Sequence, residues 1–229
     1  MIPDFPALEA AITIRAMKDY QREFLDFAIE CQALRFGEFT LKSGRVSPYF
    51  FNSGLFNTGR KLARLGRFYV QAIADSGIGF DMLYGPAYKG VPLACATAMA
   101  IAETGERDVP YAFNRKEVKK YGEGGNIIGH PLQGNVIIVD DVISAGASVR
   151  ESVQIIKTAG AVPVGMAIAL DRQERGEGTL SAVQEVETTL GLRVISIVKL
   201  ETLLKYLDGK DGGRRYLDAI TAYRRAYGT

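Results

Sequence analysis

Short apolar segments alternate with helical patterns along most of the chain, and this alternation limits the fold more than any other feature. The apolar segments are residues 80–85, 109–114, 136–139, 161–170 and 193–198. Apolar residues recur at helical spacing in residues 60–74, 91–102, 147–159 and 178–191. Continuously apolar strands separated by helices are typical of a parallel sheet that is covered on both faces. We therefore expect an α/β fold with a central, mainly parallel sheet flanked by helices.

The part of the chain before the first buried strand combines a helix with two short strands. Apolar residues recur at helical spacing from Tyr20 to Leu34 and predict an amphipathic helix there. Residues 38–51 predict two short strands around a Ser-Gly turn. Residues 1–16 differ in pattern, and we expect them to be an appended or poorly ordered extension of a single domain spanning residues 17–229.

Ligands of such sheets bind beyond the carboxyl ends of the strands. Four segments follow apolar strands and should meet at this edge: residues 85–90, 114–126, 140–148 and 171–178. The second of them is rich in lysine and arginine, which suits either a solvated charged loop or a site for an anion.

The segment Asn135–Ser148, NVIIVDDVISAGAS, has the composition of a phosphate site. Gly146 lies between two alanines, so the backbone can approach a ligand closely. Successive N–H groups that enter a helix N-terminus bind anions, and Ser144 and Ser148 add hydroxyl donors. A phosphate group bound by this loop is the expected ligand.

Asp140 and Asp141, which precede this loop, suit a different part of the ligand. Carboxylates repel phosphate, but they bind a sugar diol or a cation carried by phosphates, so the pair predicts a phosphorylated sugar. A Walker B strand, a dinucleotide fold and a receiver domain are alternatives, although no G-x-x-x-x-G-K-[ST] and no G-x-G-x-x-G after a strand occurs. A helix N-cap formed by either aspartate is the purely structural alternative.

The stretch from Val136 to Ser148 resembles the signature with which type I phosphoribosyltransferases bind 5-phosphoribosyl 1-pyrophosphate (PRPP). The order is the same: a hydrophobic strand, two acids, two apolar residues and a small, hydroxyl-rich loop. Other stretches resemble the bacterial orotate phosphoribosyltransferases, and the likeness runs from about residue 17 to the end of the sequence. These stretches are residues 36–59, 85–90, 113–126 and 170–176.

The resemblance implies the type I phosphoribosyltransferase fold, with a small N-terminal hood built mainly from residues 36–59. The implied reaction joins orotate and PRPP to give orotidine 5′-monophosphate and pyrophosphate, in the synthesis of UMP and other pyrimidines. Mg²⁺ would be carried by PRPP without a direct protein ligand. A homodimer would share its active sites, because the basic loop of one subunit would close over the site of the other.

The resemblance also implies roles for single residues. Asp140 and Asp141 would bind the ribose hydroxyls and would form the catalytic set together with Lys119. The residues implied to bind PRPP are Lys42, Tyr88, Lys89, Arg115, Lys116, Lys119, Tyr121, Asp140, Asp141, Val142, Ile143, Ser144, Ala145, Gly146, Ala147 and Ser148. Those implied to bind orotate are Phe50, Phe51, Ser144 and Arg172, with Arg172 facing the orotate carboxylate.

The sequence departs from the family pattern at several positions. Tyr121 stands where the family often has a histidine, which removes a charge and puts any proton transfer there in doubt. The sole histidine, His130, has no obvious counterpart and is expected in a surface loop. Ala147 stands where some members have a hydroxyl residue, so Ser144 and Ser148 must supply the side-chain contacts to the phosphate.

Charge and composition narrow the classes of protein that fit. A net charge of +2 argues against a general nucleic-acid surface, and Cys31 and Cys95 have no spacing typical of a disulfide framework or a zinc site. No apolar run reaches the ~18–20 residues that a membrane span needs, and no basic segment precedes the first apolar residues, so we expect the cytoplasm. A PRPP-binding regulator and an enzyme acting on another base, such as a purine, are the alternative functions.

Overall fold

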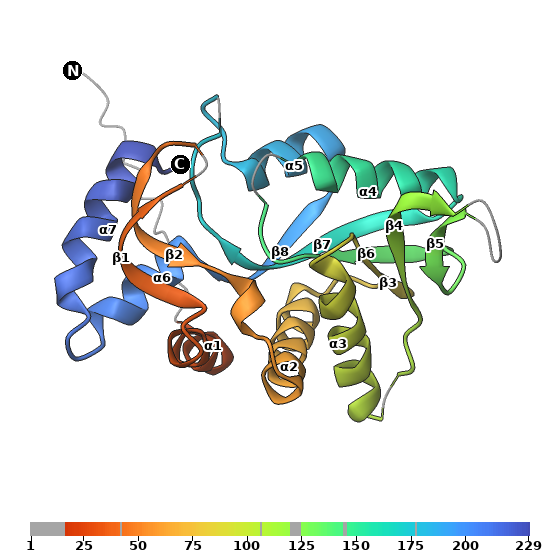
Figure 1. The fold of residues 1–229 in the computed structure, drawn as a ribbon, viewed down its shortest axis with the longest axis horizontal. Coiled ribbons are helices and arrows are strands. Elements are labelled where there is room, and N and C mark those ends of the chain that lie inside the picture. The colour runs from red at the N-terminus through yellow and green to blue at the C-terminus, as the bar shows by residue number, and fades with distance from the viewer. Residues whose placement is uncertain (1–16, 42, 106, 120–124, 144–145, 177) are drawn as a thin grey trace, which may run out of the picture.

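A six-stranded sheet forms the centre of the computed structural model, which describes residues 17–41, 43–105, 107–119, 125–143, 146–176 and 178–229. The strand order is β5-β4-β3-β6-β7-β8 (Figure 1). The strands are β3 (Met82–Gly85), β4 (Tyr111–Lys119), β5 (Gly125–Gly129), β6 (Asn135–Val139), β7 (Val162–Asp171) and β8 (Arg193–Lys199). Every neighbouring pair is parallel except β4 and β5. The predicted mainly parallel sheet is therefore confirmed.

Helices cover both faces of this sheet (Figure 1). One face carries α1 (Asp19–Glu30), α2 (Gly59–Ser76) and α3 (Gly90–Glu103), and the other carries α4 (Ala147–Thr158) and α5 (Ala182–Leu190). Two hydrophobic clusters correspond to these two layers. No helix within the described ranges is long and apolar enough to cross a membrane.

Strand β6 is fully enclosed between β3 and β7. Its side chains from Val136 to Val139 are all 0% exposed. Because side chains alternate along a strand, Ile137 packs toward α2 and α3 while Ile138 packs in the cluster that contains α4. Each such side chain contributes about 1.5–3 kcal/mol by leaving water. Because the buried strand ends at Val139, Asp140 and Asp141 lie directly beyond it at the edge of the sheet.

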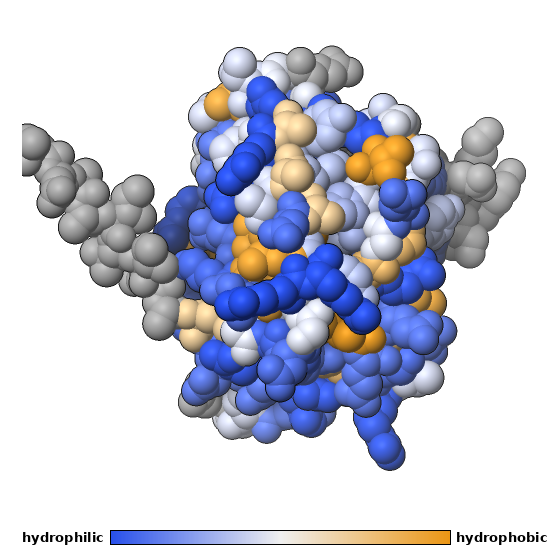
Figure 2. All heavy atoms as spheres, turned by 90° about the vertical axis from the view of Figure 1, so that its left-hand side faces the viewer, coloured by the Kyte–Doolittle hydropathy of each residue, from blue (hydrophilic) through white to orange (hydrophobic). Residues whose placement is uncertain are grey.

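A small antiparallel sheet of β1 (Leu34–Thr40) and β2 (Val46–Phe51) stands apart from the central one. The 3₁₀ helix η1 (Ser53–Leu55) follows it, and α6 (Leu200–Asp208) and α7 (Arg214–Tyr227) lie beside it (Figure 1). Stacking of Phe36 on Tyr216, with ring centroids 4.5 Å apart, joins β1 to α7. The surface at this end of the molecule is mostly hydrophilic, with small apolar patches (Figure 2).

Three boundary predictions are wrong. The helix expected over residues 178–191 covers only Ala182–Leu190, because Ser181 caps its start. The first helix ends at Glu30, because Gln32 has a positive φ of 58°, and Leu34 instead begins β1 as a buried strand residue. The strand that was expected to end at Asn114 continues as β4 to Lys119, because it pairs there with β5, which the sequence analysis did not predict. Residues 1–16 lie outside the described residues.

Helices α2 and α3 approach closely at Gly66. A Cβ atom at this position would lie 2.4 Å from the carbonyl oxygen of Ala96 in α3. A Cβ at Gly59, at the start of the same helix, would meet nothing within 4 Å. The packing of α2 on α3 therefore requires a residue without a side chain at Gly66 but not at Gly59.

We predict that Gly66→Ala lowers the free energy of unfolding by about 1–3 kcal/mol, because the helices must separate to admit the methyl group. Gly59→Ala serves as the matched control and should be neutral or stabilising by up to about 1 kcal/mol, since alanine favours the helix. Urea denaturation of both variants measures the difference. Equal free energies for the two variants would contradict the close approach.

Candidate active site

A cavity of about 1110 Å³ opens where β6 and β7 end and faces the small β1–β2 sheet. It lies at the edge where the sequence analysis expected the ligand. Of the sequence-predicted site residues, those that line it are Phe50, Phe51, Tyr88, Lys89, Asp140, Asp141, Val142, Ile143, Ser148 and Arg172. The fold thus brings together residues from four separate segments of the chain.

Asp141 is the buried centre of this cavity wall. Its Oδ2 accepts hydrogen bonds from Lys89 Nζ and from Ser53 Oγ, both at 2.6 Å. Its Oδ1 accepts the backbone N–H of Val142 at 2.9 Å, and its side chain is only 8% exposed. These partners satisfy a charge that would otherwise be costly to bury.

Asp140 is half-buried and lies next to that charge. Burial, together with the neighbouring Asp141 carboxylate, raises the pKa of Asp140 to about 7, although the Asp141 N–H and Lys89 oppose the shift. Asp140 Oδ1 accepts the backbone N–H of Asp141 at 2.9 Å, and the Tyr69 hydroxyl donates to the Asp140 carbonyl oxygen at 2.8 Å. Asp140 therefore holds a proton more readily than an ordinary aspartate.

The loop between β3 and α3 carries Tyr88 and Lys89 to the cavity. Asn114 in β4 is buried, and its Oδ1 accepts the backbone N–H of Ala87 at 2.8 Å. The Tyr88 ring is exposed, and Lys116 Nζ lies 4.9 Å from its centroid. The basic strand β4 and this loop are thus joined at two points.

The described part of the phosphate loop has the conformation expected of an anion site. Gly146 has a φ of 66° and directly precedes α4. No side chain among the described residues caps this helix end, so its first backbone N–H groups are available to a ligand. Ser148 and Arg150 both line the cavity beside it.

Arg172 forms the opposite wall, after β7. Its Nε and Nη2 donate to Glu174 Oε1 at 2.9 Å and 2.5 Å, and Nη2 also donates to Ser47 Oγ at 3.1 Å. Burial would lower the pKa of Arg172, but Tyr49 and Glu174 outweigh it and raise the pKa. The Arg172 side chain is therefore a positively charged group that these hydrogen bonds hold in place, and it is 18% exposed.

The two phenylalanines of β2 both line the cavity and also pack against other rings. Phe50 stacks on Phe39 with centroids 5.5 Å apart, while Phe51 lies 6.5 Å from Phe24 in the core. Both rings therefore belong to the aromatic packing of this part of the molecule and also to the cavity wall.

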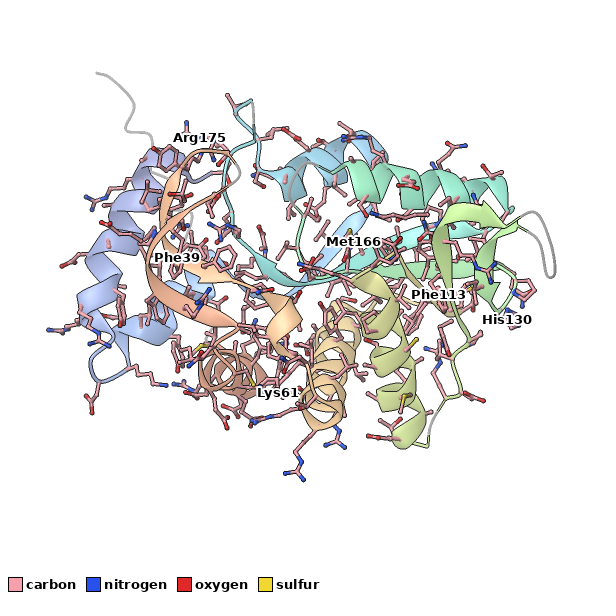
Figure 3. All side chains as sticks on the ribbon, viewed as in Figure 1. Phe39, Lys61, Phe113, His130, Met166 and Arg175 are labelled. Carbon is pink, nitrogen blue, oxygen red and sulfur yellow. The ribbon has the colours of Figure 1, made fainter. Side chains whose placement is uncertain are left out.

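Other sequence-predicted residues are not brought to the cavity wall or cannot be placed. Lys42, Tyr121, Ser144 and Ala145 lie outside the described residues, as does the side chain of Lys119, whose backbone pairs with Gly125 at the end of β4. Arg115 and Lys116 lie on β4, while Gly146 and Ala147 begin α4 without lining the cavity. His130 lies at the surface near β5, far from the site (Figure 3).

Three polar residues of the site were missed by the sequence analysis. Ser53 and Asn114 lie inside the stretches 36–59 and 113–126, but their partners Asp141 and Ala87 are distant in sequence. Glu174 lies two residues after Arg172, a spacing that signals a local ion pair. Only this last contact had a signal in the sequence.

The arrangement suits an anionic sugar ligand better than a resident metal ion. No group of three or more histidine, cysteine or acidic side chains in the described parts could hold a metal. Mg²⁺ prefers few carboxylates together with phosphate oxygens and water, so the aspartate pair fits a cation that arrives on a phosphorylated ligand.

Comparison with known proteins gives a consistent family. The phosphoribosyl transferase domain family matches residues 54–190. Orotate phosphoribosyltransferase of Klebsiella pneumoniae is 61% identical over 212 residues, which cover 93% of this chain and 100% of that protein. The protein of that name from Thioalkalivibrio sulfidiphilus is 63% identical over the same coverage.

A solved structure agrees with the sequence relatives. The crystal structure of orotate phosphoribosyltransferase from Francisella tularensis has a TM-score of 0.81 and 38% identity, and the match covers 90% of this chain and 100% of that one. With relatives this similar along nearly the whole length, the chain belongs to the orotate phosphoribosyltransferase family.

Proposed function

We propose that this protein transfers the 5-phosphoribosyl group of PRPP to orotate, which yields orotidine 5′-monophosphate for pyrimidine synthesis and releases pyrophosphate. One observation supports this function above the others. A single cavity has a Lys89–Asp141 ion pair on one wall and the largely buried, charged Arg172 on another. A sugar phosphate and an anionic base are complementary to these two walls.

The roles of the residues follow from their chemistry. Asp140 and Asp141 accept hydrogen bonds from the ribose hydroxyls, while the N-terminus of α4 binds the 5′-phosphate together with Ser148. Arg172 binds the orotate carboxylate. For the pyrophosphate, we propose Lys89 and Tyr88 together with Lys42, the basic residues Arg115, Lys116 and Lys119, and the hydroxyl of Tyr121.

The reaction breaks the bond between the anomeric carbon and pyrophosphate and forms a bond from that carbon to a ring nitrogen of orotate. The electron pair of the broken bond leaves with pyrophosphate, so negative charge grows on the leaving group and positive charge on the ribose. The ring nitrogen of orotate that attacks carries a proton, which leaves as the new bond forms and passes to water or to an oxygen of the departing pyrophosphate. Catalysis therefore rests on positioning and on cations near the leaving group, where Lys89 Nζ must exchange Asp141 for phosphate oxygen.

Mg²⁺ is the proposed cofactor, bound through the substrate. It would neutralise charge on the pyrophosphate when bound. Asp140 and Asp141 would stand near it without ligating it directly, because the ion is carried by PRPP.

We also propose a single domain over residues 17–229, with the β1–β2 sheet as a hood, and a homodimer with shared sites. Exposed apolar side chains support a partner surface: Met99 of α3 is 65% exposed and Tyr88 is 71% exposed. Tyr88 also lines the cavity, so an apolar contact there would bring a second copy of the chain next to the site.

The direct test of the function is pyrophosphate release from PRPP with orotate, uracil, hypoxanthine and adenine assayed in parallel. We predict turnover with orotate and at most traces with the other bases, because Arg172 would lack its carboxylate partner. Preference for a purine would favour another phosphoribosyltransferase activity. PRPP binding without turnover of any base would favour a regulator.

The raised pKa of Asp140 gives a pH prediction. An aspartate has a pKa of 3.8 when unperturbed and about 7 in the folded protein, so folding binds a proton between these values. Stability from this group falls as pH rises from about 4 to about 7. Asp140→Asn should therefore stabilise the free protein more at pH 8 than at pH 5, by about 1–3 kcal/mol, while it weakens PRPP binding.

The matched control is Asp26→Asn. Hydrogen bonds from Lys210 and Tyr206 outweigh burial and lower the pKa of Asp26, so it is ionised in the folded protein at both pH values. Its effect on the free energy of unfolding should be nearly equal at pH 5 and pH 8. Denaturant titrations at both values measure the four differences, and the same pH dependence for both variants would contradict the assignment.

The shared site can be tested by mixing two defective proteins. We predict that Lys119→Ala and the double variant Asp140→Asn, Asp141→Asn are each nearly inactive. In a mixed dimer, one site receives both defects and the other receives none. Random mixing in equal amounts makes about half of the dimers mixed, so about a quarter of wild-type activity should return. No recovery after confirmed subunit exchange would mean that each loop serves its own subunit.

A further inference from the structure

Glu174 holds one edge of the Arg172 guanidinium group. Both Nε and Nη2 of Arg172 donate to the same oxygen, Glu174 Oε1. Ser47 Oγ accepts a further bond from Nη2, while Nη1 makes no hydrogen bond to the described residues. A guanidinium group is a flat fork with donors along two sides, so fixing one side determines the direction of the other.

Glu174 is itself held on several sides. The Tyr49 hydroxyl donates to Glu174 Oε1 at 3.4 Å, and the Tyr49 ring lies 4.4 Å from the Arg172 guanidinium carbon. The backbone of Glu174 pairs with Gly228 in an antiparallel bridge, and Arg175 N–H donates to the Tyr227 carbonyl at 2.8 Å. Figure 3 shows Arg175 at this end of the molecule, above the hood.

The Arg172–Glu174 ion pair lies where it would meet a charged ligand in the cavity. Both side chains line the cavity, and they are 18% and 13% exposed. The carboxylate neutralises Arg172 in the free protein without occupying all of its donors.

We propose that Glu174 is a positioning residue that aims the free edge of Arg172 at the carboxylate of the base. This deepens the proposed function and rests on it. The acceptor oxygen of Glu174 sets the direction of Arg172, whereas its negative charge is dispensable for binding an anionic base. Removal of the oxygen should therefore weaken use of orotate, while removal of the charge alone should not.

The test compares Glu174→Gln, which keeps an acceptor at the same reach, with Glu174→Ala, which removes it. We expect Glu174→Ala to raise the KM for orotate about tenfold or more and to change the KM for PRPP less than about twofold. Glu174→Gln should restore the KM for orotate to within about threefold of wild type. Arg172→Ala is the reference and should show the same selective loss as Glu174→Ala.

A second variant covers the case in which Glu174→Ala fails to fold. Glu174→Asp keeps the charge but withdraws the oxygen by one methylene, so it should raise the KM for orotate more than Glu174→Gln does. Glu103→Ala, which removes the partner of Arg67 in an exposed pair, is the control and should leave both KM values unchanged.

Several outcomes would overturn the positioning role. A lowered thermal midpoint with an unchanged ratio of the two KM values would make Glu174 a purely structural residue. Equal losses in Glu174→Gln and Glu174→Ala would show that the charge and not the acceptor matters. A wild-type protein that releases no pyrophosphate with orotate would instead reject the proposed function, and with it the base on which this role depends.

Discussion

The carboxylate of Asp141 joins the parts of the molecule that make the site. It is delivered by the end of a fully buried strand, and its Oδ2 accepts from both Lys89 Nζ and Ser53 Oγ at 2.6 Å. Lys89 belongs to the loop after β3, and Ser53 to the turn that connects the hood to α2. One acceptor thus fixes three segments, and a buried charge with these partners is costly to disturb.

The charges of the cavity are arranged in opposite pairs and not as a single basic patch. Lys89 is paired with Asp141 and Arg172 with Glu174. Each cation is therefore held in place before a ligand binds. A phosphate or carboxylate group of the ligand then replaces the protein carboxylate, or binds the cation beside it. Electrostatic groups that are already oriented need less reorganisation as charge develops.

The sheet, and the gathering of ten candidate site residues at one cavity, could be predicted from the sequence because both depend on local patterns. The apolar run before Asp140, the small loop around Gly146 and the arginine after β7 could be read without a structure. Contacts between distant segments could not: nothing in the sequence ties Ser53 to Asp141 or Asn114 to Ala87. Strand β5 was missed because GNIIG is short and contains two glycines, and it becomes a strand by pairing with β4, mainly with Ala112, Phe113 and Asn114.

That short strand has a consequence for how the protein behaves in a crowded solution. β5 lies at one border of the central sheet, where unpaired backbone groups could join the strand of another molecule. Its glycines and its length of five residues leave few positions at which a foreign strand could pair in register. The hairpin that carries the basic residues of β4 therefore also protects the sheet against edge-to-edge aggregation. Gly129 helps to keep the strand short, because its φ is +97° and a Cβ atom there would lie 2.5 Å from the carbonyl oxygen of Tyr111.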